Sequence, residues 1–433
     1  MEILRFTEES FKSPSIFDSR GTGHFLLPTM KPTIQLPSYP KDLTDWWWKE
    51  VVHHWSDHGE EKILNLLREE IVRQSDRFNK SRDFDPSAYG ARDLSLLAYG
   101  NFYTPRTFAA SGFSLAESFN YLGWRAPGKG PIQILDLGCG SGASSLASLF
   151  YLRSWGIKNP IILDAWDYSG KSLAFLRRIH RENQHLWPNT KISTERKDIR
   201  NLAASFPCRE SYDLILSSYA LNECWEGESS STYSETILSL GNWLKESGQI
   251  LLIEPAEGQV CRSLHSATAL ASSMSEKLFI QAPYFNGMPC PLWEGNSKYF
   301  SHEVRACTPS PQVERINHPL NLEIRDVKFG LSILSRTPPK PHCPENGIAR
   351  IISPVRKRKG TISFWGIGAD GKETEYEWQR RTLEKEDQRH LLELQRGDVV
   401  EISGIKDHSD KRIRVQKADQ ITPVFLPRWD IRN

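Results

Sequence analysis

The sequence has few of the features that mark secreted, membrane-spanning or disulfide-stabilised proteins. Its 433 residues include only 7 cysteines, at irregular spacing and without a Cys-x-x-Cys pair, which excludes a disulfide framework and favours a reducing compartment. No apolar run approaches the roughly 20 residues that a membrane-spanning helix needs. The N-terminal stretch has early acidic residues and no long apolar segment. We therefore expect no secretory signal or transit peptide, no membrane partner and a cytoplasmic location.

The chain also has little net charge. Its 55 Lys and Arg residues nearly balance 53 Asp and Glu residues, which leaves a formal charge of +2. Any attraction to nucleic acid must therefore come from local clusters. An apolar content of 39% with 14 tryptophans excludes a disordered chain, and the length allows two or three domains.

The pattern along the chain predicts four regions. Residues 1–44 contain scattered Pro, Gly and Ser and predict an extended arm, and helical spacing of apolar residues predicts a helical region over 45–125. Strands alternating with helices predict an α/β domain over 126–336, with a loop insertion at 260–310. Period-two alternation over 345–425 predicts a small antiparallel β domain, or barrel.

The α/β region supplies the most specific pattern. Short apolar strands there end in polar or acidic residues, which predicts a mostly parallel sheet with helices on both faces and ligands at the carboxyl ends of its strands. The first strand runs into "DLGCGSG" (136–142), a glycine turn that lets backbone approach a ligand closely. Dinucleotide-binding enzymes use a similar turn, but here Asp136 precedes the glycines directly. Asp167 then ends the second strand and Asp198 follows the third.

This combination resembles the class I S-adenosylmethionine-dependent methyltransferases, which have a Rossmann-like sheet. In that family the glycine turn shapes the methionine side of the pocket, the residue matching Asp167 binds ribose and the one matching Asp198 lies near adenine. Asp164 is an alternative for the ribose, although it lies inside the strand. A sheet of this kind with a degenerate pocket is the alternative for the whole site. The resemblance implies S-adenosylmethionine as cofactor and a site made by Asp136, Gly138, Gly140, Gly142, Asp167, Asp198 and Ser217.

The methyl acceptor has no clear signature. The fourth strand ends in "SSYALNE" and lacks the Asn/Asp-Pro-Pro-aromatic motif that positions an exocyclic base nitrogen. Cys139 lies inside the cofactor turn, where packing explains a small thiol better than nucleophilic catalysis does. Glu223 and Glu254 follow strand ends and either polarise an acceptor or hold helix termini. No catalytic residue is assigned, because methyl transfer can proceed mainly by positioning of donor and acceptor.

A second resemblance covers roughly residues 85–405. The segments "AYGNFYTPRTFAA", "DLGCGSG", "APY…CPL…YFSHE", "FGLSILSR", "RIISPVRKRKG" and "RGDVV" occur in an order similar to that of methyltransferase-like proteins associated with the mitochondrial small ribosomal subunit and their bacterial relatives. This resemblance implies small-subunit ribosomal RNA, or the subunit itself, as partner. Two alternatives stay open: an assembly factor that binds cofactor or RNA without methyl transfer, and methylation of a small molecule, which leaves the basic β domain unexplained.

The same family looks like a group of iron–sulfur proteins with four cluster cysteines. Only Cys290 occupies a matching position here; the others fall at Tyr284, at Phe300 and near Trp365 or Gly366. One thiolate cannot hold a four-cysteine cluster, so we expect the cluster to be lost and aromatic packing to replace it. Two other metal sites are considered, a His54–His58 pair and a group of Cys261, His302 and Cys307, but neither has a usual ligand spacing.

Basic residues near the start of the β domain are the candidate RNA contacts. The predicted set falls within ten positions and consists of Arg350, Arg356, Lys357, Arg358 and Lys359. Lys411, Arg412 and Arg414 form a second basic group in a later strand. A solvated charge run is the alternative interpretation.

Overall fold

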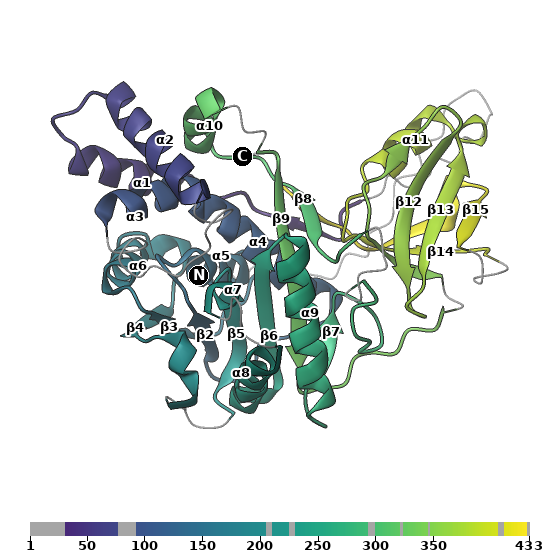
Figure 1. The fold of residues 1–433 in the computed structure, drawn as a ribbon, viewed down its shortest axis with the longest axis horizontal. Coiled ribbons are helices and arrows are strands. Elements are labelled where there is room, and N and C mark those ends of the chain that lie inside the picture. The colour runs from purple at the N-terminus through teal and green to yellow at the C-terminus, as the bar shows by residue number, and fades with distance from the viewer. Residues whose placement is uncertain are drawn as a thin grey trace, which may run out of the picture.

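The computed structural model describes residues 31–76, 92–204, 210–224, 230–292, 299–320, 324–344, 347–405 and 411–430 (Figure 1). Two bodies of secondary structure lie side by side: a large α/β part with an N-terminal helical layer, and a smaller β-rich part formed by the chain from β10 onward. No helix within these residues has both the length and the apolar character that a membrane span requires.

The described helices are α1 (Lys41–His54), α2 (Glu60–Asp76), α3 (Asp93–Phe102), α4 (Thr104–Ala116), α5 (Ala143–Ser154), α6 (Gly170–Glu182), α7 (Leu221–Cys224), α8 (Ser230–Trp243), α9 (Gly258–Ser273), α10 (Pro311–Asn317) and α11 (Lys385–Leu392). The strands of the α/β part are β2 (Ile132–Leu137), β3 (Ile161–Asp167), β4 (Thr190–Arg196), β5 (Tyr212–Ser218), β6 (Leu244–Pro255), β7 (Phe279–Ala282), β8 (Glu303–Ala306) and β9 (Asp326–Ser335). The remaining strands are β1 (Ile34–Leu36), β10 (Ile348–Ile351), β11 (Arg356–Lys357), β12 (Thr361–Gly368), β13 (Glu373–Gln379), β14 (Val399–Ile402), β15 (Arg412–Val415), β16 (Ile421–Phe425) and β17 (Pro427–Trp429).

The large sheet has the strand order β4-β3-β2-β5-β6-β9-β7, and β8 pairs with β9. Strands β2 to β6 are parallel, whereas β9 runs antiparallel between β6 and β7. The chain order reverses beside the central strand β2, which creates the crevice where ligands of open α/β sheets bind. This topology is the class I methyltransferase fold, and the prediction of that fold is confirmed.

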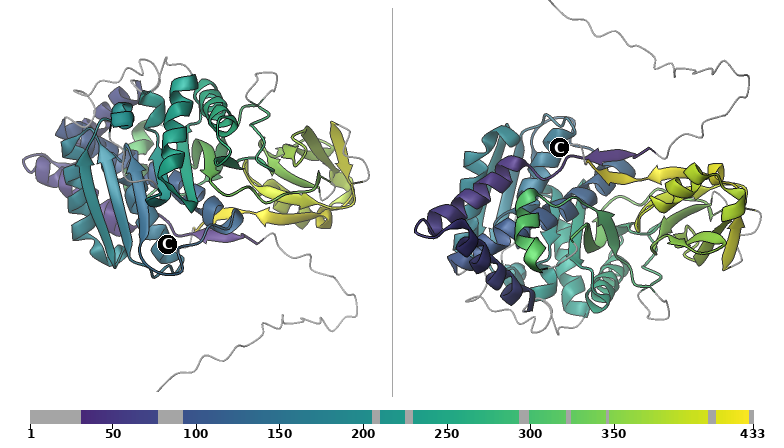
Figure 2. Two further views of the ribbon diagram at one scale, coloured as in Figure 1. Left: turned by 90° about the horizontal axis from the view of Figure 1, so that it is seen from below. Right: turned by 90° about the horizontal axis from the view of Figure 1, so that it is seen from above.

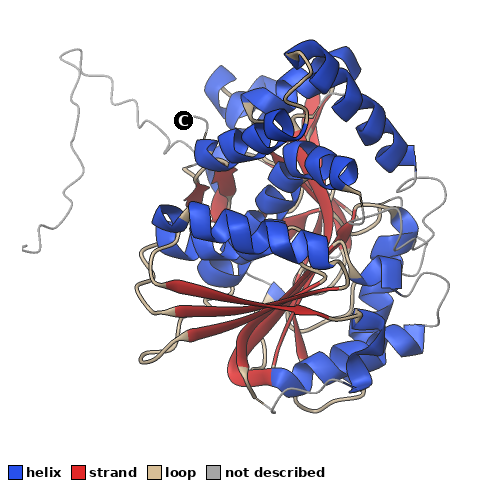
Figure 3. Cartoon of the chain, turned by 90° about the vertical axis from the view of Figure 1, so that its left-hand side faces the viewer, coloured by secondary structure: helices blue, strands red, loops and turns tan. Residues whose placement is uncertain are grey.

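Helices cover both faces of the sheet (Figure 3). Side chains of β2 alternate between two cores: Ile134 packs with Leu146 of α5 and Leu176 of α6, whereas Leu135 packs in the core that α8 and α9 cover. Because the central strands β2 and β5 are buried on both sides, they carry near-continuous apolar runs in the sequence, whereas the edge strand β4 does not.

The N-terminal helices form a layer over the carboxyl edge of the sheet (Figure 1). In α1 the buried Leu43, Trp46, Trp47 and Val51 recur at helical spacing, which gives the helix one apolar face. This helix begins at Lys41, within the predicted arm of residues 1–44. Part of that arm is also a strand, because Ile34–Leu36 pairs in parallel with Pro427–Trp429 near the C-terminal end (Figure 2).

The second sheet follows the path β15-β13-β12-β10-β14-β16, with β11 beside β12. It is antiparallel as predicted except for β13 and β15, which are parallel. No pairing joins β15 to β16 among the residues described, so the sheet is not a closed barrel by its hydrogen bonds. Phe425 and Trp429 bury their rings in the core of the methyltransferase part, which ties the two parts together.

Candidate cofactor and RNA sites

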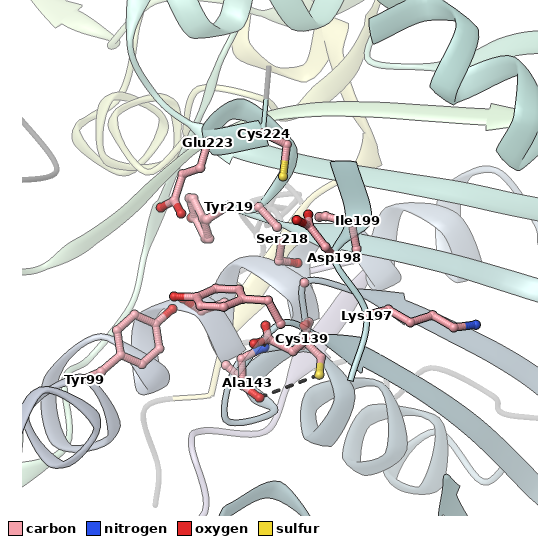
Figure 4. A pocket seen from close by; sticks show the side chains of 17 residues that line it. Tyr99, Cys139, Ala143, Lys197, Asp198, Ile199, Ser218, Tyr219, Glu223 and Cys224 are labelled. Carbon is pink, nitrogen blue, oxygen red and sulfur yellow. Dashed lines mark hydrogen bonds between the residues drawn. The ribbon is translucent and has the colours of Figure 1, made fainter. Parts of the chain in front are cut away.

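A pocket opens at the carboxyl ends of β2, β3 and β5, under α3 and α4 (Figure 4). Its volume of about 650 Å³, counting its mouth, lies in the range of cofactor sites. The glycine turn forms its floor, and the segments after β3, β4 and β5 form its walls. The lining residues are Tyr99, Thr107, Gly138, Cys139, Gly140, Ala143, Ser144, Asp167, Tyr168, Lys197, Asp198, Ile199, Ser218, Tyr219, Ala220, Glu223 and Cys224.

The glycine turn needs its glycines for two reasons. Gly138 has a φ of +66°, and a Cβ there would lie 2.3 Å from the Cβ of Ala220 on the opposite wall. Gly142 has a φ of +95° and packs against Leu176 of α6, so that α5 can start close to the sheet. Gly138 and Gly140 line the pocket, whereas the predicted cofactor residue Gly142 lies behind its wall.

Asp167 lies between the glycine turn and the segment after β3. Its Oδ2 accepts a hydrogen bond from the amide of Gly140 at 2.8 Å, and its Oδ1 accepts one from the amide of Ser169 at 2.7 Å. Each carboxylate oxygen has a second lone pair for a ribose hydroxyl. Burial raises the pKa of Asp167 to about 6. The alternative residue, Asp164, accepts a hydrogen bond from Tyr212 within the sheet and does not line the pocket.

Two other predicted cofactor residues lie outside the pocket lining. Asp136 is fully buried beneath the glycine turn, where its Oδ2 accepts hydrogen bonds from Ser144 at 2.7 Å and Ser145 at 2.5 Å. It therefore holds the start of α5, and burial raises its pKa to about 7. Ser217 is also fully buried; its neighbour Ser218 lines the pocket, because successive side chains of a strand point to opposite sides. The choice of Ser217 is corrected to Ser218.

Asp198 lines the wall of the pocket that follows β4, beside the apolar side chain of Ile199. A hydrogen bond and ion pair with Arg200 hold the pKa of Asp198 below its ordinary value. The carboxylate is therefore ionised at neutral pH and can accept a hydrogen bond from an amino group. Lys197 lies with its ammonium 3.6 Å from the centre of the Trp166 ring and closes this end of the pocket.

The opposite side of the pocket is lined by two tyrosines and a glutamate. Tyr99, Tyr219 and Glu223 lie on one side of it, away from Lys197 and Asp198 (Figure 4). Tyr219 has a φ of +59°, a strained conformation of the kind found at functional sites. Sequence reasoning missed both tyrosines. The strand-end position of Tyr219 in "SSYALNE" was a usable signal, but only the packing of α3 over the sheet brings Tyr99 here.

The two candidate glutamates differ in their surroundings. Glu254 is buried outside the pocket lining, and its Oε1 accepts hydrogen bonds from the amide of Asn222 at 3.2 Å and the hydroxyl of Tyr233 at 3.3 Å. It therefore holds the start of α7, and burial raises its pKa to about 8. Glu223, in contrast, lines the pocket.

Cys139 also lines the pocket, within the glycine turn. Burial holds the pKa of the Cys139 thiol well above its ordinary value, which agrees with packing and not nucleophilic catalysis.

The loop around Cys290 is an apolar cluster. Cys290 is 4% exposed and packs with Tyr284, Leu292, Ile352 and Ile367, with Trp365 at the edge. Three of the positions that the resemblance assigns to cluster ligands thus meet in one place, two of them as aromatic residues. Across the described ranges, no group of three or more His, Cys, Asp or Glu side chains could hold a metal ion, so Cys261, His302 and Cys307 form no such site.

Arg350, a predicted RNA contact, is instead a buried structural cation. Its side chain is 2% exposed, and its guanidinium bonds Glu117 at 2.7 and 2.8 Å and Glu303 at 2.8 Å. The prediction was wrong because Arg350 lies in the buried strand β10, before the exposed part of the charge run begins. The ion pairs join the β part to the end of α4 and to β8.

The other predicted RNA contacts form a basic turn, here defined as Arg356–Lys359, in which Lys357, Arg358 and Lys359 are exposed and Arg356 is half-buried in β11. The guanidinium of Arg380 donates to the carbonyl oxygens of Arg358 at 3.1 Å and Lys359 at 3.4 Å, which places a fifth cation beside it. Within the described ranges, no carboxylate forms an ion pair with the basic turn. The second basic group differs, because Arg412 and Arg414 of β15 pair with Glu375 and Glu377 of the adjacent β13.

Comparisons with known proteins agree with the fold. The profile of the family described as tellurite resistance protein TehB matches residues 127–226. A TehB-like SAM-dependent methyltransferase from Corynebacterium glutamicum is 12% identical over 53% of this chain and 88% of its own, with a TM-score of 0.28. TrmN from Thermus thermophilus is 15% identical over 54% of this chain and 53% of its own, with a TM-score of 0.30. No curated protein matches the chain. The fold assignment rests on the strand order of the chain itself, which places the pocket at the carboxyl edge of a class I methyltransferase sheet.

Proposed function

We propose that this protein binds S-adenosylmethionine and acts as a methyltransferase on small-subunit ribosomal RNA. The observation that carries the cofactor part is the position of Asp167, a buried carboxylate that backs the glycine turn at the carboxyl edge of a class I sheet. The RNA part is supported by the basic turn and by the resemblance in the order of sequence segments.

The pocket residues fit this cofactor in chemistry and in order. The glycine turn would hold the methionine part, Asp167 would accept the ribose hydroxyls, and Ile199 with Asp198 would hold the adenine. When bound, S-adenosylmethionine supplies an electrophilic methyl group on its sulfonium. The chain contributes orientation, since Tyr99 and Tyr219 offer aromatic faces on which a base can stack beside the cofactor.

The basic turn suits an RNA backbone because three of its four cations are exposed and none forms an ion pair within the described ranges. Cations of this kind bind phosphates and release counterions, so affinity falls as salt rises. The paired arginines of β15 offer no such free charge. The turn therefore supplies general RNA affinity, while the pocket determines which atom receives the methyl group.

The RNA part is tested by replacing Arg356, Lys357, Arg358 and Lys359 with Gln. Binding to small-subunit ribosomal RNA should weaken, and the slope of log affinity against log salt should flatten by about 2–4 units, at roughly 0.7–0.9 per lost contact. A control variant with the same charge change replaces four exposed, scattered lysines with Gln: Lys158, Lys191, Lys277 and Lys340. Equal slopes of log affinity against log salt in the basic-turn variant and the control would show that the basic turn is an ordinary solvated surface without RNA contacts.

Methyl transfer is tested with radiolabelled S-adenosylmethionine and small-subunit RNA from a deletion strain. We expect label to enter the RNA at one position. Binding of both ligands without transfer of label would instead assign the protein to assembly factors that bind cofactor and RNA without turnover.

A further inference from the structure

The β part has the connectivity of an oligonucleotide/oligosaccharide-binding fold (Figure 1). Its first strand, β10, pairs antiparallel with both β12 and β14. Its third strand, β13, runs parallel to β15, which forms one bent fifth strand with β16. Helix α11 lies between β13 and β14 in the chain, and Leu391 of this helix is buried in the core of the β part. In this fold the face of the second and third strands and the loop after the first strand bind oligonucleotides.

The basic turn lies in that loop, between β10 and β12. The chain after β13 adds two cations beside the turn. The amide of Arg380 donates to the carbonyl oxygen of Gly360 at 2.9 Å, which holds the end of β13 against the turn. The exposed Arg381 donates from its Nε to the side-chain oxygen of Gln379 at 3.0 Å. Positive charge therefore gathers at one end of the face that β12 and β13 form.

The outer face of β12 and β13 is polar with one aromatic ring. The inner side chains of these strands are the apolar alternate residues Ile362, Phe364, Tyr376 and Trp378. The residues between them point outward, because successive side chains of a strand alternate in direction. The strand register places the outward residues in two rows across the sheet, and these are Trp365–Glu375–Arg412 and Arg356–Ser363–Glu377–Arg414.

In both rows an exposed arginine lies over a buried carboxylate. Glu375 pairs with Arg412 at 2.8 Å, and Glu377 pairs with Arg414 at 3.4 Å. The two arginine side chains are 61% and 58% exposed, whereas both glutamates are buried. The ion pairs thus hold two guanidinium planes at the surface of the sheet. Trp365, which is half-buried, adds an aromatic ring at the start of the first row. Such planes are the surfaces on which unpaired bases stack.

The far end of this face is covered by the chain itself. Ile367, two residues beyond Trp365 on β12, packs with Tyr284 and Cys290 of the loop that follows β7. The open stretch of the face therefore runs from Trp365 to the basic turn. Stacking surfaces and a cluster of cations lie next to each other along it, which is the combination that proteins use for single-stranded nucleic acid.

We propose that the β part binds single-stranded RNA along this open face, with phosphates on the basic turn and bases stacked on Arg412, Arg414 and Trp365. The arginines of β15 act through their planes, since their charges are already paired, whereas the turn acts through its charge. A duplex offers phosphates to the turn but keeps its bases inside, so it cannot use the stacking surface. The inference rests on the proposed function only for RNA as the nucleic acid.

The first test compares three RNA probes by fluorescence anisotropy with the full chain at one salt concentration. The probes are a single strand of about twelve nucleotides without self-complementarity, the same strand annealed to its complement, and an abasic strand of equal length. The single strand should bind at least about tenfold more tightly than the other two, because only it offers free bases. Affinity for the duplex or for the abasic strand equal to that for the single strand would overturn the proposal.

The second test removes the guanidinium planes and keeps the charge. Replacing both Arg412 and Arg414 with Lys should weaken binding of the single strand at least about fivefold. Duplex binding and the slope of log affinity against log salt should not change. The control makes the same replacement at Arg177 and Arg181, two exposed arginines of α6, and should bind as the wild type does. Single-strand affinity equal in the wild type and in the Arg412→Lys, Arg414→Lys variant would overturn the proposal.

A third variant tests the aromatic ring independently of the ion pairs. Trp365→Leu keeps an apolar side chain at the edge of the Cys290 cluster and should weaken single-strand binding at least about fivefold, whereas Trp55→Leu, a half-buried tryptophan after α1, should not. Affinity for S-adenosylmethionine should be the same in all these variants. Methyl transfer to RNA by a chain that binds the duplex as tightly as the single strand would overturn this inference and leave the proposed function. Preference for the single strand in a chain that does not bind S-adenosylmethionine would do the reverse.

Discussion

The substitution Arg350→Met should strongly destabilise the protein, because it removes the one cation that Glu117 and Glu303 share. Arg350 bonds Glu117 twice, at 2.7 and 2.8 Å, and Glu303 at 2.8 Å, and all three side chains are almost fully buried. Breaking a buried ion pair by removing one partner costs about 3–5 kcal/mol, since the remaining charge stays uncompensated. Methionine has a similar length, so loss of packing contributes little.

The loss should depend on pH in a direction that the pKa shifts determine. Burial holds the pKa of Glu117 above its ordinary value even with Arg350 present. Burial would also raise that of Glu303, but Arg350 and Arg305 hold it below its ordinary value. Without Arg350 both pKa values should rise, so the folded variant binds protons that the unfolded chain releases. The free energy of unfolding of the variant should therefore fall as pH rises. The loss relative to the wild type should be larger at pH 8 than at pH 5.

Urea unfolding followed by tryptophan fluorescence measures this loss. The control is Arg358→Met, the same substitution at an exposed position of the basic turn, which should change stability by no more than about 0.5 kcal/mol. Adding Glu117→Gln to Arg350→Met should recover part of the loss, because one of the stranded carboxylates is gone. A loss below about 1 kcal/mol in Arg350→Met, together with weaker RNA binding, would refute the assignment of Arg350 as a structural cation.

Two further predictions concern buried groups near the cofactor turn and in the β part. The raised pKa of Asp136, about 7 in the folded state against roughly 3.9 when unfolded, means that stability should fall as pH rises between these values. Asp136→Asn should remove part of that fall, and urea midpoints that depend on pH as in the wild type would contradict this. Cys290→Ser should lower the free energy of unfolding by about 1–3 kcal/mol, because it buries a hydroxyl in an apolar cluster. It should leave the metal content unchanged. Elemental analysis after anaerobic purification should find no stoichiometric iron or zinc, and either metal would show that ligands were missed.

The fold could be predicted from the sequence because its signals are local. Most strands of the parallel sheet are apolar runs with a polar or acidic residue at or near their carboxyl end, the edge strand β4 being the exception, and the glycine turn follows the first strand directly. The position of Asp167 at the end of β3 follows from the same pattern. These features depend on neighbours in the chain and not on long-range packing.

The errors have a common physical origin, since a linear pattern does not say which way a side chain points. Ser217 and Ser218 are adjacent in the sequence, but only Ser218 faces the pocket. Arg350 was grouped with the basic turn, although its flanking apolar residues Ile348 and Ile351 predict a buried strand. Tyr99 was missed because its place in the pocket depends on how α3 packs over the sheet.

The most direct test of the central claim is calorimetric titration of the purified protein with S-adenosylmethionine. We predict one binding site, with affinity reduced at least about tenfold in Asp167→Ala, since each lost charge-assisted hydrogen bond is worth about 1.5–3 kcal/mol. Asp164→Ala, three residues earlier on the same strand and outside the pocket, should bind within about twofold of the wild type. Unchanged binding in Asp167→Ala would remove only the ribose assignment. Absence of binding to the wild type would contradict the cofactor site and the proposed function with it.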